Sequence, residues 1–66
     1  MFSNLEAEMA RIGMKRANLA GAIGMKTANL SMKMKKKVKF SLEEALKIKD
    51  ALNTEIPVET LFEWSE

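Results

Sequence analysis

Two short helical segments that meet at Gly24 constrain this chain more than any other feature. The run from Arg16 to Leu30 places Ala20 four residues before that glycine and Leu30 six residues after it. A small side chain lets two helices approach closely, and a glycine takes the positive φ that ends a helix at little steric cost. The spacing therefore predicts a helix-turn-helix, with the two helices crossing at a steep angle.

We expect this helix-turn-helix to occupy residues 16–34. One helix should run from about Lys15 to Ile23, and the next from Lys26 or Thr27 to about Met34. Leu30 and Met34 are four residues apart and share one helix face, so both should be buried. The residues expected to hold the two helices together are Leu19, Ala20, Ile23, Gly24, Met25 and Leu30.

A first helix is expected before this unit. Ser3 and Glu6 have the spacing of a capping box, in which each side chain bonds the other residue's backbone N–H. Apolar residues then recur at helical spacing, and Gly13 should stop the helix. The inward positions of this helix are Leu5, Met9 and Ile12.

Two further helices are expected after residue 40. Ser41 and Glu44 form a stronger capping box, because acidic residues also suit the positive end of the helix dipole. This helix should end near Asn53, and Pro57 suits the first turn of a short last helix. The inward residues of the longer helix are Leu42, Ala45, Leu46, Ile48 and Leu52; those of the last are Val58, Leu61 and Phe62, with Trp64 as a lid.

The segment between these parts has a mixed pattern. Apolar residues and lysines alternate from Met32 to Phe40, except that Lys36 breaks the alternation. We expect residues 35–39 to form a mostly extended loop, with Phe40 returning to the core. A period of two also suits a strand, so a short β segment is the alternative.

These elements predict an all-α fold: a compact bundle of about five short helices in a single domain, residues 1–66. Four methionines have core spacing and should fill it (Met9, Met14, Met25 and Met34), whereas Met32 should lie outside. The chain has no Cys, His or Tyr. We therefore expect no disulfide, metal site, cofactor or enzymatic activity. No apolar run approaches the roughly 20 residues of a membrane span, so a soluble cytoplasmic protein is expected.

Charge divides the chain into two unlike parts. Residues 1–40 hold nine basic and two acidic residues, a net charge of +7, while residues 41–66 hold two basic and seven acidic ones, a net charge of −5. A basic part that contains the helix-turn-helix fits a surface that binds a polyanion. The alternatives for the lysines are a solvated surface, or recognition of an anionic membrane or an acidic protein.

With these features the chain resembles the Cro/cI-type (XRE-like) helix-turn-helix domains of phage repressors and small bacterial regulators. The resemblance covers Asn4 to about Phe62 and is carried by Leu19-Ala20, Ile23-Gly24-Met25, Leu30-Ser31 and the run from Phe40 to Ile48. It implies a lambda-repressor-like fold that binds operator DNA as a dimer and controls transcription. The third helix would then enter the major groove. A second hypothesis is a protein-interaction module, such as an antirepressor or antitoxin, that keeps this fold.

The resemblance also implies roles for individual residues. The start of the third helix and the turn after it would face the bases, and basic residues around them would meet phosphates. The implied base contacts are Lys26, Thr27, Ala28, Ser31 and Met32. The implied phosphate contacts are Lys15, Arg16, Lys33, Lys35, Lys36 and Lys37.

The chain departs from its relatives at four places. An acidic residue is common in the relatives where this chain has Ala17 or Asn18. Lys15 stands where many have a Ser or Thr cap, and Gly21 lies inside a helix, where it costs about 1 kcal/mol relative to Ala. Lys35-Lys36 replaces the Asn-Gly that often follows the third helix. These departures predict a marginal second helix and a more electrostatic binding surface. The residues after Asn53 are the expected site of dimerisation.

Overall fold

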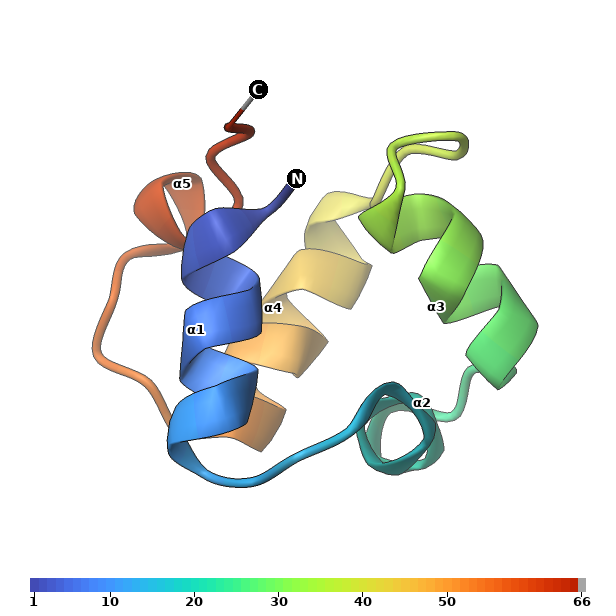
Figure 1. Cartoon of the computed structure of the whole chain (residues 1–66), viewed down its shortest axis with the longest axis horizontal. Coiled ribbons are helices and arrows are strands. Elements are labelled where there is room, and N and C mark those ends of the chain that lie inside the picture. Colours follow the sequence, from blue (N-terminus) through green and yellow to red (C-terminus); the bar gives the residue numbers. More distant parts are fainter. Residues whose placement is uncertain (66) are drawn as a thin grey trace.

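Five helices and no strand are found in residues 1–65, the part of the chain that the computed structural model describes. In chain order they are α1 (Ser3–Arg11), α2 (Arg16–Ile23), α3 (Thr27–Met34), α4 (Leu42–Leu52) and α5 (Val58–Leu61) (Figure 1). The all-α class and the number of helices are confirmed, and the short β segment considered as the alternative to a loop at residues 35–39 is not found in these residues. Glu66, the last residue of the expected domain, lies outside the described residues.

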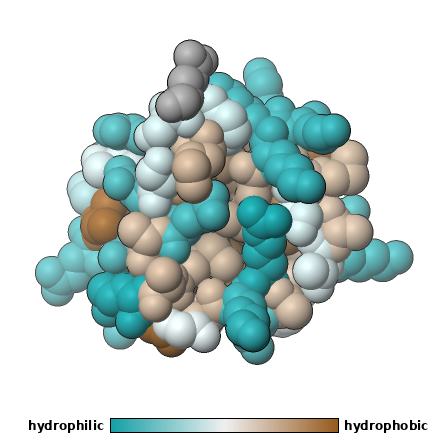
Figure 2. Space-filling model, viewed as in Figure 1, coloured by the Kyte–Doolittle hydropathy of each residue, from teal (hydrophilic) through white to brown (hydrophobic). Residues whose placement is uncertain are grey.

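The helices pack so that α3 is supported from one side only. α2 packs against both α3 and α4, and α5 packs against α1 and α4. Figure 1 shows α3 at one edge of the molecule, opposite α1 and α5. In the same view, Figure 2 shows hydrophobic atoms reaching the surface between hydrophilic side chains, as expected for a chain too short to enclose its core completely. None of the helices is long and apolar enough to cross a membrane in the described residues.

Every helix contributes at least one fully buried side chain to a single core. Full burial of a leucine or isoleucine side chain stabilises a fold by about 1.5–3 kcal/mol each. The fully buried side chains are those of Leu5, Leu19, Leu30, Ile48, Leu52 and Leu61. Met9 and Met34 are also buried, and Met14, Met25 and the half-buried Ile23 pack against the core. The expected core positions of the helix-turn-helix and of these methionines are confirmed.

The two glycines expected to stop helices do so by the same geometry. Gly13 has a φ of 67° and Gly24 a φ of 69°, in the left-handed region that favours glycine. After Gly24, the N–H of Met25 donates to the carbonyl of Ala20 at 2.8 Å. This bond satisfies a carbonyl that the end of α2 would otherwise leave without a donor. The turn of the helix-turn-helix is thereby fixed.

The turn after α3 follows the same pattern without a glycine. The N–H of Lys37 donates to the carbonyl of Met32 at 3.0 Å, and Lys36 takes a φ of 63°. The expectation of a mostly extended loop was therefore wrong where the loop begins, because the last carbonyls of α3 recruit donors by wrapping the chain tightly. The ammonium of Lys36 lies 5.0 Å from the ring centroid of Trp64. Phe40 packs against the core, as expected.

The expected capping box at Ser3 is wrong. Ser3 is already helical, Phe2 is the N-cap residue, and no side chain caps the helix. The ring of Phe2 lies 5.0 Å from that of Trp64 and 5.9 Å from that of Phe62, with edge-to-face geometry. This aromatic packing fixes where α1 begins. Ile12, expected to face inward, is 40% exposed because it follows the last residue of the helix.

The capping box at the start of α4 is confirmed. The hydroxyl of Ser41 accepts from the N–H of Glu44 at 3.1 Å, and the carboxylate of Glu44 accepts from the N–H of Ser41 at 2.9 Å. The expectation that Leu42 and Leu46 face inward is wrong, however, because Leu42 is 68% exposed and Leu46 is 50% exposed. The core contacts only one stripe of α4, formed by Ala45, Ile48 and Leu52.

The C-terminal segment closes the core. Pro57 is the N-cap of α5 rather than part of its first turn, and its carbonyl accepts from the N–H of Leu61 at 2.8 Å. The side-chain amide of Asn4 donates to the carbonyl of Thr60 at 2.9 Å and ties α1 to α5. Phe62 and the half-buried Trp64 pack against the core, in agreement with the expected lid.

Candidate nucleic-acid interface

The outer side of α3 carries the residues expected to contact bases. Lys26 is the N-cap, and Thr27 and Ala28 form the first turn; all three are exposed. Met32 is 44% exposed, and Ser31 is half-buried. Leu30 and Met34 fix the opposite side of the helix in the core. The five residues therefore lie along one short helix whose orientation is set by buried contacts.

Sequence reasoning missed Asn29. This residue is exposed on α3, one position after Ala28. Successive helical residues are rotated by about 100°, which puts Met32 between Ala28 and Asn29 around the helix axis, with all three on the side turned away from the core. Its amide both donates and accepts, so it can pair with an adenine edge in the major groove. The signal was present in the sequence, since the burial of Leu30 and Met34 directs position 29 outward.

The start of α2 lies close to the end of α3. Lys15 is the exposed N-cap of α2, and Arg16 is the half-buried first residue. Both line a surface hollow that Met34 also lines. Lys15 supplies no side-chain cap, as expected, but the amide oxygen of Asn18 accepts from the N–H of Lys15 at 3.1 Å. The cap missing from Lys15 is thus partly replaced by Asn18.

The lysines that follow α3 differ in their surroundings. Lys35, Lys36 and Lys37 are all exposed on the turn, but the ammonium of Lys36 is directed over Trp64. Lys33 contacts the carboxylate of Glu44, and its side chain is only 15% exposed. Lys35 and Lys37 are therefore exposed with no partner among the described residues, Lys36 lies over an aromatic ring, and Lys33 is paired with α4.

The contact between Lys33 and Glu44 also changes the pKa of the Glu44 carboxyl. The hydrogen bond from Lys33, together with the backbone of Ser41, lowers the pKa of Glu44 from its ordinary value of 4.5. Glu44 is therefore ionised at neutral pH. The end of α3 is fixed to the start of α4 by this charged contact.

The described residues contain no group of His, Cys, Asp and Glu side chains that could hold a metal ion. The exposed chemistry of α3 and its neighbours consists of ammonium, guanidinium, hydroxyl, amide and small apolar groups. Such a set can hydrogen-bond phosphates and base edges and contact thymine methyl groups.

Comparison with known protein families gives a direct result. A family model described as a Cro/C1-type HTH DNA-binding domain matches residues 4–66. A search of curated proteins and a search of solved structures each found no match.

Proposed function

The chain belongs to the family of Cro/C1-type helix-turn-helix DNA-binding domains, and on that basis we propose that it is a sequence-specific transcriptional regulator. α3 enters the major groove of an operator, as the second helix of such a unit does. The observation that carries the proposal is the outer side of α3, where exposed polar and small apolar side chains stand on a helix anchored by Leu30 and Met34.

In this proposal each exposed side chain of α3 makes a different kind of base contact. Lys26 donates to the guanine O6 and N7 atoms, and Asn29 pairs with an adenine edge. Thr27 and Ser31 hydrogen-bond bases or nearby phosphates. Ala28 and Met32 contact thymine methyl groups. Discrimination then comes from α3, and orientation comes from the residues around it.

Phosphate contacts are assigned to the basic residues on both sides of α3. Lys15 and Arg16 reach the backbone from the start of α2, and Lys35 and Lys37 reach it from the turn after α3. Lys36 joins them only by leaving Trp64. Lys33 is expected to contribute least, because its ammonium already contacts Glu44.

The regulator acts on DNA in the cytoplasm as a homodimer, in the manner of a phage or prophage repressor. A single DNA-binding module buries only about 600–1,000 Å² of protein surface on DNA, and useful specificity comes from two half-sites. The proposed operator is therefore pseudo-palindromic.

The second candidate is a protein-interaction module, such as an antirepressor or antitoxin. Leu42 and Leu46, exposed on α4 in the acidic part of the chain, favour it. The two candidates differ in whether a preferred DNA sequence exists.

Selection of bound sequences from a random duplex pool separates them. Salt at ~0.15 M suppresses purely electrostatic binding. Enrichment of a palindrome with half-sites about one helical turn apart supports the regulator. A variant with Asn29→Ala and Ser31→Ala should lose that enrichment and keep its fold. Recovery of no motif by the unmodified protein overturns sequence-specific regulation and favours the protein-interaction module.

A further inference from the structure

An apolar groove crosses the surface beside the turn that follows α3. Its cavity volume is about 480 Å³. Phe2, Phe40 and Phe62 form its floor together with Ala45, and Phe40 and Phe62 pack edge to face with ring centroids 5.0 Å apart. Figure 1 shows this turn at the same end of the molecule as the N-terminus and the segment that follows α5. No residue of α3 is among those that line the groove, so a partner in the groove need not cover the outer side of α3.

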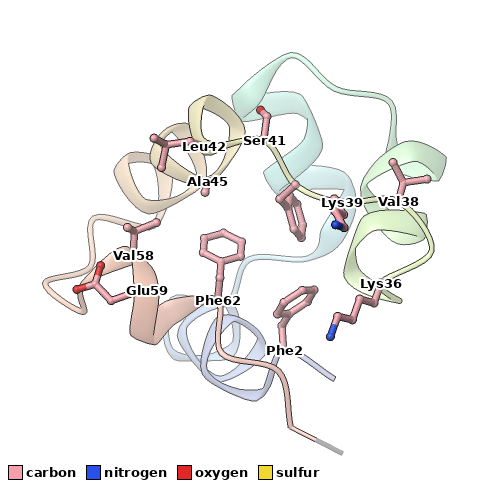
Figure 3. A pocket seen from close by; sticks show the side chains of 11 residues that line it. Phe2, Lys36, Val38, Lys39, Ser41, Leu42, Ala45, Val58, Glu59 and Phe62 are labelled. Carbon is pink, nitrogen blue, oxygen red and sulfur yellow. The ribbon is translucent and has the colours of Figure 1, made fainter.

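Two walls border this groove, and they carry opposite charge. Leu42, Val58 and Glu59 stand on one side, from α4 and α5 (Figure 3). Lys36, Val38 and Lys39 stand on the other, from the turn after α3 (Figure 3). We call these the acidic wall and the basic wall.

Each wall also exposes an aliphatic side chain. Leu42 is 68% exposed on the acidic wall, and Val38 is 44% exposed on the basic wall. The helical pattern of α4 favours burial of Leu42, yet no part of the described chain covers it. Burial of such side chains against a partner is favourable in proportion to the apolar area removed from water.

We propose that this groove is the dimer interface and that its occupant is a second copy of the chain, with the two-fold axis parallel to the groove. Such an axis sets the acidic wall of each copy against the basic wall of the other, so that Glu59 meets Lys39 twice. An axis across the groove would set like charges against each other. Charge complementarity therefore selects both the partner and the axis.

The dimensions of the chain fit this arrangement on DNA, and to that extent the inference rests on the proposed function. The Cα atoms span 24 × 24 × 20 Å. With about 8–10 Å between packed helix axes, two touching copies have centres about 28–34 Å apart, depending on which faces touch. Half-sites one turn apart are separated by about 34–36 Å. Contact through one end of the molecule thus spans nearly the whole distance between half-sites.

The test measures association without DNA, by sedimentation equilibrium at low salt and protein concentrations up to about 1 mM. The unmodified protein should form a dimer. Lys39→Glu and Glu59→Lys should each weaken association by about tenfold or more, because each sets like charges against one another. Asp50→Lys makes the same charge change as Glu59→Lys on an exposed part of α4 outside the groove, and should leave the dimer intact.

Mixing the two weakened variants gives the decisive measurement. Lys39→Glu puts a carboxylate at both position 39 and position 59 of one copy, and Glu59→Lys puts an ammonium at both positions of the other. The mixture should form a heterodimer, and the double variant Lys39→Glu/Glu59→Lys should regain the homodimer. A monomer at every concentration, or charge variants that associate as well as the unmodified protein, would overturn the inference. Circular dichroism verifies that each variant is folded.

The outcomes of this test distinguish a wrong dimer interface from a wrong proposed function. A dimer that shows the charge-reversal behaviour but selects no DNA sequence keeps the interface and removes sequence-specific regulation. A protein that selects a single half-site and stays monomeric keeps DNA recognition and removes the interface.

Discussion

The ammonium of Lys33 at the end of α3 contacts the carboxylate of Glu44 in the first turn of α4. The same carboxylate accepts from the backbone N–H of Ser41 at 2.9 Å. One acidic side chain therefore caps α4 and holds the proposed recognition helix against it. This relationship links the orientation of α3 to the ionisation of Glu44.

Acid should weaken the fold through Glu44. The pKa of Glu44 is lowered from 4.5, chiefly by Lys33, so the unfolded chain binds its proton at a higher pH than the folded chain does. The stabilisation is therefore complete above about pH 4.5 and is lost as the pH falls through the lowered pKa.

Thermal unfolding at a series of pH values should show that Glu44→Gln reduces this acid-induced loss of stability. Glu43→Gln, in the same turn, leaves the Lys33 contact in place and should retain it. Equal curves for the Glu44→Gln variant and the unmodified protein would contradict this prediction.

Removing the lysines of the turn should weaken DNA binding to all sequences alike. Each phosphate that a protein neutralises contributes about 0.9 to the slope of log K against log salt concentration. Changing Lys35, Lys36 and Lys37 to Ala should therefore flatten the slope by up to ~3 units per monomer. Fluorescence anisotropy at several salt concentrations measures it. Lys47→Ala, on the exposed side of α4, is the control and should leave the slope unchanged. An unchanged slope for the triple variant would place these lysines outside the interface.

Polar residues on α3 should affect sequence preference rather than general affinity. Asn29→Ala, Thr27→Ala or Ser31→Ala should each change discrimination at one operator position by about 1–3 kcal/mol. Competition between operators that differ at one base pair measures this effect. Asn18→Ala provides a comparison, since that amide bonds the start of α2 and is not expected to read bases. A uniform loss across all operators would show that the changed residue does not read a base.

Lys36 should bear a backbone cost that only the tertiary structure reveals. Its φ of 63° is unfavourable for a residue with a Cβ atom, while its ammonium lies near Trp64. Lys36→Gly and Lys36→Ala both remove the ammonium, but only glycine relieves the backbone. The glycine variant should therefore be more stable than the alanine variant by about 1 kcal/mol.

Thermal denaturation checks this comparison. A difference of about 1 kcal/mol shifts the Tm of a chain this small by roughly 4–8 °C. The fluorescence of Trp64 should change to the same extent in both variants, since both lose the nearby cation. Equal Tm values would mean that the left-handed conformation of residue 36 carries no measurable cost.

The sequence by itself determined those features that depend on a few neighbouring residues. Gly13 and Gly24 end helices because of local backbone sterics, and Ser41 with Glu44 begins one through bonds that span three residues. Leu19 and Leu30 are buried at positions that helical periodicity indicates. The family resemblance rested in part on Leu19, Gly24, Leu30 and the run that contains Ser41 and Glu44, and it is confirmed.

Only the tertiary structure decided the features that join distant parts of the chain. Phe2 becomes the N-cap of α1 where Phe62 and Trp64 pack around its ring, and Lys36 adopts its turn beside Trp64. Leu42 and Leu46 satisfy the helical pattern, yet remain exposed because no other helix covers that side of α4 in the described residues. Periodicity states which side chains share a face, whereas burial depends on what packs against that face. That is settled by contacts between residues far apart in the sequence.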